Sequence, residues 1–414
     1  MAVILKIPTE NTKGVIVFTN RDDEAFIKKD KKLQNRLEAL KKNWVFGIHN
    51  NWHNHKFKYN SLYDFHIAGN KYLKEINNTK FTQFCQSAAN FVPNNFSFSN
   101  NEKMWDILYI AKAVNFKKIP DLFEAIRKLY DSGKMYRVLF IAPVPPQCKR
   151  NFFKHAYFCD IRKVYNEMFT REERKLFNLL TLDYEYPFPF DLDTLAHFYK
   201  SSRIFVFSSD DEMRPRTVGY AISTGMPIVV RDSISYLLPD NLRKEPYLYL
   251  VDKREKYPEM IEKAIEYTKS EDYTFESMEK SMKEFNNLFN INRLRDGILE
   301  TYEIDLFEND KSYSALNNLD IRIARHHGFG HDGHSIGWHL ESLLNYIEKQ
   351  PFEKMLLDIN EKDFEKEITK YEKYGKLHMK SLHKEGFKSK LKSFLVNLYN
   401  KYSWFNKSVN FIRK

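Results

Sequence analysis

The sequence contains few cysteines and no long apolar run. Only three of its 414 residues are cysteine, and none belongs to a CxxC pair: Cys85, Cys148 and Cys159. An odd number of cysteines without paired spacing argues against a disulfide framework and predicts a reducing compartment. No segment approaches the roughly 18 apolar residues of a membrane-spanning helix, and the apolar run at 2–5 is too short for a signal peptide. We therefore expect a cytoplasmic protein, with peripheral binding to the inner face of the membrane left open.

Acidic residues are the minority charge. Lys and Arg number 66 against 55 for Asp and Glu, which gives a formal net charge of +11 at pH 7. A basic surplus predicts an anionic partner, and a nucleotide, a nucleic acid or an acidic membrane would each qualify. The richness in Lys, Asn, Ile, Tyr and Phe also follows from an AT-rich genome, so the charge alone does not select a partner.

Short apolar runs alternate with amphipathic segments along most of the chain. Continuous runs of Val, Ile, Phe and Leu predict strands buried on both faces of a parallel sheet, and the charged segments between them predict covering helices. The predicted strands are 14–19, 44–49, 64–69, 105–111, 136–142, 178–182, 204–208 and 227–230. The predicted helices are 22–42, 70–76, 119–131, 160–178, 193–200, 215–224 and much of 257–299. The fold class is therefore α/β, with two Rossmann-like doubly wound domains facing a cleft.

Changes of composition divide the chain into three parts. The Asn/Ser-rich stretch at 90–103 has the turn chemistry of a connection, so a short first domain (1–92) precedes a second one (93–300). Residues 301–414 do not continue the alternation and predict a His/Gly-rich loop followed by a mostly helical extension. Ligands of open α/β sheets bind beyond the carboxyl ends of the strands, so the loops after the strands should carry the site.

Lysines follow the predicted strand 105–111. Lys112 comes directly after it, and Lys117 and Lys118 precede the predicted helix 119–131. The free N–H groups and positive dipole end of a helix N-terminus favour a diphosphate, and lysines strengthen such a site. Lysines just outside a helix are also often only solvated, and the segment alone leaves both interpretations open.

An acidic loop with two arginines follows the predicted strand 204–208. Asp210, Asp211 and Glu212 come first, and Arg214 and Arg216 lie around a proline suited to a first helical turn. Carboxylates can hold sugar or ribose hydroxyls, and arginines at a helix start can bind phosphate oxygens in a bidentate manner. A solvated loop with internal ion pairs is the alternative.

Together these segments resemble the donor-binding half of GT-B glycosyltransferases, specifically the retaining enzymes called GT4-like (glycosyltransferase group 1). Residues 107–126 resemble that family's strand, Gly-Arg, Lys-Gly and amphipathic helix. Residues 191–232 resemble its helix, strand ending in Ser, acidic loop, helix and Gly-x-Pro-Val-Val strand. The resemblance implies a nucleotide-sugar donor domain at 93–300, an acceptor side at 1–92, and transfer with retention of anomeric configuration.

The resemblance also implies roles for individual residues. Lys112 and Lys117 stand where the family has the arginine and lysine that neutralise the donor's diphosphate. Glu212 matches the first glutamate of the E-x7-E motif, which would hold hydroxyls of the transferred sugar. The second glutamate, which binds the ribose, corresponds to Tyr220, whose hydroxyl or ring can contact a ligand but cannot accept hydrogen bonds as a carboxylate does.

Further candidates follow from the same resemblance. Arg214, Arg216 and Thr217, at the start of the helix after the acidic loop, are expected to contact the donor. GT-B enzymes often place a sugar- or acceptor-contacting histidine in the first domain, so His49 joins Glu212 as a predicted catalytic residue.

Two carboxylate pairs have other predicted roles. Asp22 and Asp23 are alternative carboxylates of the cleft. The Asp-Leu-Asp at 191–193 looks like a metal-binding DxD, but it opens a helix, where aspartate is a common cap, and Asp193 is the predicted N-cap. Side-chain cations and helix N–H groups suffice to stabilise a diphosphate leaving group, so neither a metal nor another cofactor is expected.

Two C-terminal segments keep several interpretations. Residues 325–339 combine five histidines with four glycines and predict a loop against the cleft, a zinc site or an ordinary surface loop, although no Cys or HExxH accompanies them. Residues 387–414 carry apolar residues at helical spacing, seven basic residues and no acidic one. This pattern is typical of a helix on an anionic membrane, but a helix packed on the protein or against nucleic acid fits as well.

The predicted function is transfer of a sugar from a nucleotide-diphosphate sugar to a cell-envelope glycan or lipid-linked saccharide. Two alternatives stay open, namely a glycosyltransferase acting on modified DNA bases and a relative that binds a glycan or nucleotide without turnover. Strongly salt-dependent DNA binding would favour the first of these, and donor hydrolysis would contradict the second.

Overall fold

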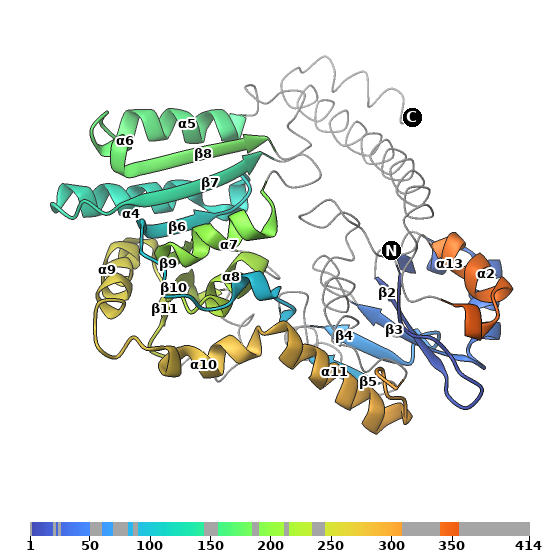
Figure 1. Cartoon of the computed structure of the whole chain (residues 1–414). Coiled ribbons are helices and arrows are strands. Elements are labelled where there is room, and N and C mark those ends of the chain that lie inside the picture. The colour runs from blue at the N-terminus through green and yellow to red at the C-terminus, as the bar shows by residue number, and fades with distance from the viewer. Residues whose placement is uncertain are drawn as a thin grey trace, which may run out of the picture. The chain divides into compact units, whose positions relative to one another are not determined.

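The computed structural model describes residues 2–19, 22–23, 26–49, 60–68, 82–85, 90–144, 156–183, 190–210, 215–233, 245–308 and 340–355. The strands within these residues form one sheet of five strands and one of six (Figure 1). Both sheets belong to the compact unit 1–358, while 359–414 form a separate unit outside the described residues. The predicted α/β class, built on two largely parallel sheets, is confirmed.

The first sheet has the order β1-β2-β3-β4-β5. Its strands are β1 (Val3–Lys6), β2 (Gly14–Thr19), β3 (Trp44–His49), β4 (Phe65–Ala68) and β5 (Thr82–Cys85). Strands β2 to β5 run parallel, whereas β1 pairs with β2 in the antiparallel direction. The predictions for β2, β3 and β4 are confirmed, but β1 and β5 were missed because each has only four residues.

The predicted helix at 22–42 is shorter than expected. A 3₁₀ turn (η1, Ile27–Lys29) precedes helix α2, which spans Lys31–Leu40. Asp30 sets the start of α2, since its carboxylate accepts hydrogen bonds from the backbone N–H groups of Lys32 and Leu33. The predicted helix at 70–76 lies outside the described residues.

The second sheet is entirely parallel, in the order β11-β10-β9-β6-β7-β8. Its strands are β6 (Trp105–Ile110), β7 (Val138–Val144), β8 (Phe177–Asp183), β9 (Ser202–Phe207), β10 (Ile228–Arg231) and β11 (Leu248–Val251). The predictions for β6 to β10 are confirmed, and each end of these strands lies within two residues of the predicted one. Strand β11 was missed because its run LYLV is short.

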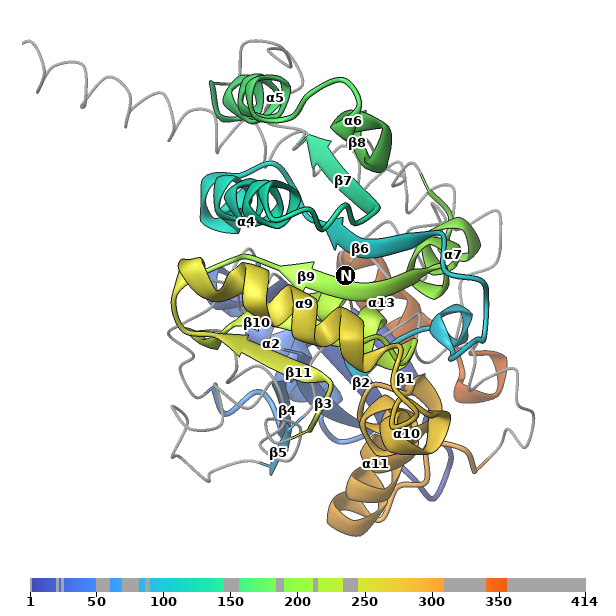
Figure 2. The same cartoon turned by 90° about the vertical axis from the view of Figure 1, so that its left-hand side faces the viewer.

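Helices cover both faces of the second sheet (Figure 2). One face carries α4 (Ile119–Asp131), α5 (Ala156–Met168) and α9 (Tyr257–Tyr267), and the other carries α7 (Leu192–Lys200) and α8 (Arg216–Ser223), with α10 (Phe275–Glu284) against α8. Short turns complete this region: η3 (Asn94–Phe96), η4 (Asn115–Lys117), α6 (Glu173–Leu176) and η8 (Arg254–Lys256). The predicted helix 160–178 is shorter than expected, since α5 ends at Met168 and the separate α6 precedes β8.

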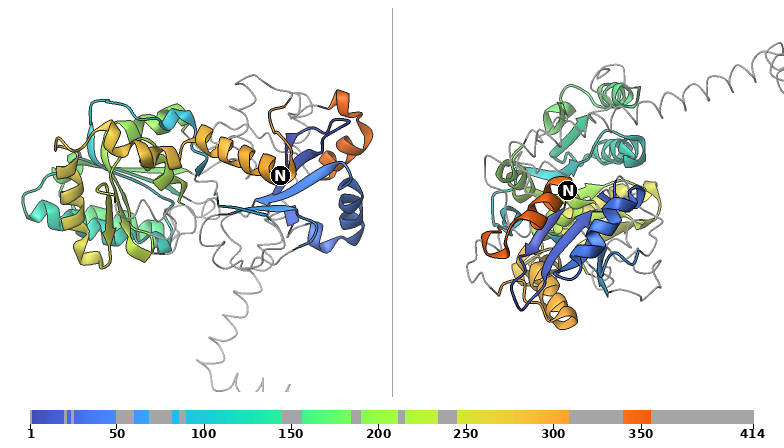
Figure 3. Two further views of the ribbon diagram at one scale, coloured as in Figure 1. Left: turned by 90° about the horizontal axis from the view of Figure 1, so that it is seen from below. Right: turned by 90° about the vertical axis from the view of Figure 1, so that its right-hand side faces the viewer.

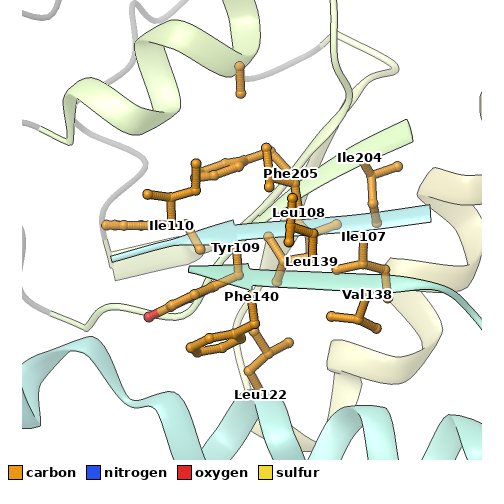
Figure 4. Close-up of a cluster of buried hydrophobic side chains, with 14 of the residues drawn as sticks. Ile107, Leu108, Tyr109, Ile110, Leu122, Val138, Leu139, Phe140, Ile204 and Phe205 are labelled. Atoms are coloured by element: carbon orange, nitrogen blue, oxygen red, sulfur yellow. The ribbon is translucent and has the colours of Figure 1, made fainter. Parts of the chain in front are cut away.

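Aliphatic and aromatic side chains fill the core between β6, β7 and α4 (Figure 4). Tyr109 of β6 stacks on Phe140 of β7 with ring centroids 4.3 Å apart, and Phe123 of α4 packs against Phe140 and Phe177. Rings of this size each bury a large apolar area, which fixes the spacing between the helix layer and the sheet. The sheet is therefore a rigid support for the loops at its edges.

The helix α11 (Asn287–Tyr302) belongs to the core of the first sheet. The helix lies beside the strands of the first sheet (Figure 3). Its residues Ile291, Leu294 and Ile298 are fully buried in one cluster with apolar residues of β1, β2, β3 and β4. The predicted division at 300 assigned this helix to the second domain. Its apolar face instead completes the first core, which the alternation pattern could not indicate.

Part of the predicted C-terminal extension also packs on the first half of the chain. Helix α13 (Leu340–Lys349) is followed by the turn η9 (Phe352–Lys354). Arg36 of α2 forms a two-pronged ion pair with Glu348 and a hydrogen bond with Asn345. Within the described ranges, no helix is both long enough and apolar enough to cross a lipid bilayer.

Candidate functional site

Charged side chains gather at the carboxyl edge of the second sheet. Lys117 and Lys118 follow β6, Asp210 follows β9, and Arg231 ends β10. Since β10, β9 and β6 are parallel neighbours in the sheet, these residues come together at one edge. This is the edge at which ligands of open α/β sheets bind.

Two serines after β9 fix the loop that follows β6. The buried hydroxyl of Ser208 donates to the carbonyl oxygen of Lys117 over 2.7 Å, and that of Ser209 donates to the carbonyl of Phe116 over 3.1 Å. The backbone N–H of Asp210 donates to the same Phe116 carbonyl. The loop carrying the lysines is therefore tied directly to the neighbouring strand.

The ammonium group of Lys117 lies over aromatic rings. Its Nζ is 4.6 Å from the ring centroid of Phe207, the last residue of β9, and 5.1 Å from that of Phe116. Lys117 is buried, so its charge is only weakly screened by water. A cation held in this way attracts an anion more strongly than a solvated lysine does. Lys112, at the start of the same loop, is exposed.

Lys118 occupies a strained backbone position at the start of α4. Its φ is 48°, in the left-handed region that favours glycine, and the GT4-like pattern has glycine at this position. No side chain of the described segments caps α4. Pro120 in the first turn has no N–H, and the N–H of Asp121 donates to the carbonyl of Lys118, so this helix end favours an anion at the sheet edge through its positive dipole end.

Asp210 balances part of the positive charge. Its carboxylate lies 3.5 Å from Nζ of Lys118 and 3.2 Å from Nε of Arg231. In the first turn of α4, partial burial raises the pKa of the Asp121 carboxyl, with Arg254 opposing the rise and Asp210 adding to it. Three cations face two carboxylates here, so the edge suits an anionic ligand.

The structure gives Tyr220 a packing role. Its ring is buried and stacks on Phe96 with centroids 4.0 Å apart and planes 12° apart, and Tyr199 packs edge-on against it. Because both faces of a ring packed in the core are occupied, this ring does not offer a platform for a nucleotide. The ring of Tyr220 therefore packs against Phe96 in the core instead of stacking on a ligand.

The remaining predicted donor contacts fall on α8 and on the loop before it. Arg216 and Thr217 are the first two residues of α8 and are half-buried. Glu212 and Arg214 lie outside the described residues. Gly225, with a φ of 74°, follows the end of α8, and Met226 and Pro227 separate it from β10.

The predicted residues of the first half lie on the first sheet. His49 is buried at the end of β3. Asp22 and Asp23 are also buried, and Asp23 accepts a hydrogen bond from the hydroxyl of Tyr63 over 2.7 Å and pairs with Lys28 over 2.5 Å. The carboxylate of Asp23 is thus satisfied within the protein, which gives it a structural role.

The Asp-Leu-Asp at 191–193 caps a helix. Asp191, rather than the predicted Asp193, is the N-cap of α7, and its carboxylate accepts from the N–H of Thr194 over 2.7 Å. Asp193 instead accepts from the side-chain amide of Asn95. In the part of the chain that the structure describes, no three His, Cys, Asp or Glu residues are grouped to hold a metal. The segments 325–339 and 387–414 lie outside it.

Sequence reasoning missed one charged residue of this edge. Arg231 directly follows the predicted strand 227–230, and an arginine at the end of a buried run was the available signal.

No family model matches the chain, and no curated protein sequence matches it significantly. Similar solved structures include a sucrose-phosphate synthase from Thermosynechococcus elongatus, with 13% identity and a TM-score of 0.43, covering 64% of this chain and 69% of that one. TarM has 13% identity and a TM-score of 0.46, with 71% of this chain and 55% of TarM covered. A UDP-forming trehalose-phosphate synthase from Burkholderia xenovorans has 11% identity and a TM-score of 0.43, with 70% and 74% covered.

Proposed function

We propose that the chain is a GT-B-type glycosyltransferase that takes a sugar from a nucleotide-diphosphate sugar. The observation that carries this proposal is the meeting of Lys117, Lys118 and the start of α4 with the end of β9 at one sheet edge. Both of these segments resemble the donor-binding motifs of retaining GT4-like enzymes. A polar, cationic edge next to a helix N-terminus is the arrangement that a diphosphate requires.

The proposed chemistry depends on charge that develops on the leaving group. When the bond between the sugar and the diphosphate breaks, negative charge accumulates on the diphosphate oxygens. Lys117 is preplaced by its contact with Phe207, and the hydrogen bonds from Ser208 and Ser209 fix its loop, so little reorganisation is needed during the reaction. Side-chain cations and the positive dipole end of α4 supply the stabilisation, so the proposal requires no metal. Glu212 and His49 stay the proposed catalytic residues.

The proposed acceptor is a cell-envelope glycan or a lipid-linked saccharide. The basic, amphipathic segment 387–414 supports this choice, because it would bring the enzyme to an anionic membrane surface at which such acceptors are assembled. Retention of the anomeric configuration is proposed from the motif resemblance.

A thermal-shift screen with UDP, GDP, ADP and their sugar conjugates tests the donor site. A ligand that binds only the folded state must raise the melting temperature by mass action, so one nucleotide class should stabilise the wild type. The shift, measured against each variant's own unliganded value, should shrink in Lys117→Ala and Glu212→Ala. It should persist in Lys163→Ala, which removes a lysine that is 70% exposed on α5.

Product analysis then tests the reaction. Incubation with the stabilising nucleotide sugar should release the nucleoside diphosphate, slowly without acceptor and faster with membrane-derived glycolipid, and NMR of the product gives the anomeric configuration. If no nucleotide stabilises the protein while duplex DNA or anionic vesicles do, the proposed donor site is wrong.

A binding protein without turnover is the second candidate. The packing of Tyr220 in the core favours it, because the ribose-binding carboxylate of the family has no counterpart at that position. Release of nucleoside diphosphate that depends on Lys117 would exclude this candidate. Binding of the nucleotide sugar without any release over hours would support it.

A further inference from the structure

Arg231 holds a buried positive charge that the described part of the protein only partly satisfies. Its side chain is 19% exposed, and the Nε and Nη1 atoms are fully buried without a hydrogen-bond partner. The Nε atom lies 3.2 Å from Oδ1 of Asp210, but its N–H does not point at that oxygen well enough to form a hydrogen bond. Such unmade hydrogen bonds are costly for a buried cation.

The guanidinium group lies at the carboxyl edge of the second sheet, where ligands of open α/β sheets bind. Arg231 is the last residue of β10, and the neighbouring strand β9 leads into Asp210, whose carboxylate also pairs with Lys118. The backbone of Asp210 is held by two hydrogen bonds: its N–H donates to the carbonyl of Phe116, and its carbonyl accepts from the hydroxyl of Ser233. One carboxylate is thus shared between two cations of the same edge.

We propose that Arg231 binds an oxyanion of the ligand and that Asp210 is an internal counter-ion, which gives up Arg231 and Lys118 when that oxyanion arrives. Arginine suits this task because its planar, forked donor group matches phosphate and carboxylate oxygens. The oxyanion belongs either to the donor's diphosphate or to a carboxylate on the sugar itself. Only this identification of the ligand rests on the proposed function, because the anion site follows from the geometry alone.

Inorganic pyrophosphate is the first probe, since it tests the anion site without a nucleotide. Its affinity for the full chain, measured by calorimetry, should fall about tenfold or more in Arg231→Met, because charge-assisted hydrogen bonds are lost. Arg203→Met is the matched control. Arg203 lies at the amino end of β9, pairs with Asp106 and is 28% exposed, so this change should leave pyrophosphate affinity intact.

Two more variants separate binding from folding. Arg231→Lys keeps the charge but loses the bidentate hydrogen bonding of the guanidinium group. Its pyrophosphate affinity should therefore lie between those of the wild type and Arg231→Met. Asp210→Asn removes the competing carboxylate and should bind pyrophosphate more tightly than the wild type. Weaker binding by Asp210→Asn would overturn the counter-ion role, and wild-type affinity of both Arg231 variants for pyrophosphate and for UDP-glucuronate would overturn the site.

Comparison of UDP, UDP-glucose and UDP-glucuronate distinguishes the two sources of the oxyanion. Equal losses for all three in Arg231→Met assign Arg231 to the diphosphate. A loss confined to UDP-glucuronate assigns it to the sugar carboxylate. If pyrophosphate binding depends on Arg231 but no nucleotide sugar is consumed, the proposed function fails while the anion site stands. If nucleotide sugars are consumed with no dependence on Arg231, the proposed function stands while the anion site fails.

Discussion

The ring of Phe96 lies flat on the ring of Tyr220, with the centroids 4.0 Å apart and the planes 12° apart. Phe96 belongs to the connection that precedes the second sheet, whereas Tyr220 belongs to α8 on one face of that sheet. The position at which GT4-like enzymes carry a ligand-binding glutamate is thus used here to hold the connecting segment against the sheet. With tyrosine in place of glutamate, this position contributes to the stability of the domain rather than to recognition of a ligand.

Substitutions at Tyr220 should therefore change stability more than ligand affinity. Tyr220→Ala should lower the free energy of unfolding by about 3–5 kcal/mol, as expected for a large buried ring. Tyr220→Phe keeps the stacked ring and should cost only about 1 kcal/mol. Urea unfolding measures both, and nucleoside diphosphate binding to Tyr220→Phe should match the wild type. A large loss of affinity in Tyr220→Phe would instead give the hydroxyl a role in binding.

The hydrogen bond from Ser208 to the Lys117 carbonyl should matter for binding as well as for stability. Ser208→Ala should cost about 1 kcal/mol of stability and weaken nucleoside diphosphate binding about threefold, because the lysine loop is released. Ser202→Ala is the matched control, since Ser202 is equally buried and makes a hydrogen bond of the same length, 2.7 Å, at the amino end of the same strand. Equal affinities in the two variants would show that the loop needs no such anchor.

Two glycines that end helices should differ in their tolerance of alanine. Gly133 after α4 and Gly225 after α8 have φ values of 81° and 74°, and both sit in the same type of hydrogen-bonded helix end. A Cβ on Gly133 would meet nothing within 4 Å, whereas one on Gly225 would lie 2.6 Å from the ring of Phe98.

Gly133→Ala should therefore cost about 1 kcal/mol from backbone strain alone, and Gly225→Ala about 2–3 kcal/mol. Thermal unfolding of the two variants checks the difference. Equal melting temperatures would mean that Phe98 moves aside without cost.

The ion pair between Arg127 and Glu173 should make stability depend on acid. Two hydrogen bonds of 2.7 Å from the guanidinium hold the pKa of the Glu173 carboxyl at about 2. A carboxyl whose pKa is lowered by folding stabilises the protein at neutral pH, and that contribution is lost as the pH falls from about 4.5 toward about 2.

Glu173→Gln should thus be less stable than the wild type by about 1–2 kcal/mol at pH 7, with the difference shrinking between pH 4.5 and pH 2. Urea unfolding across this range measures it. Glu172→Gln is the control, because Glu172 is 75% exposed and its surface ion pair with Lys175 should contribute little. A difference that does not change with pH would assign the effect to packing.

The strands of the second sheet and the chemistry of its loops could be predicted from local sequence. Buried strands require continuous apolar runs, and β6, β9 and β10 display them. The chain order fixes which residues follow each strand, so Lys117 lies after β6 and Asp210 lies after β9. Short elements such as β1 and β11 carry too few residues for a periodic signal. They are strands only because a neighbouring strand offers them hydrogen bonds.

Only the tertiary structure decided which residues act together. The sequence by itself determined the α/β class, most strands of the second sheet and the lysines at the start of α4. It could not show that Tyr220 stacks on Phe96 or that Arg231 shares Asp210 with Lys118, since these pairs are distant in sequence. Local patterns record backbone preference and burial, whereas the partner of a side chain depends on which strands and helices become neighbours, and that order is set by packing of the whole sheet.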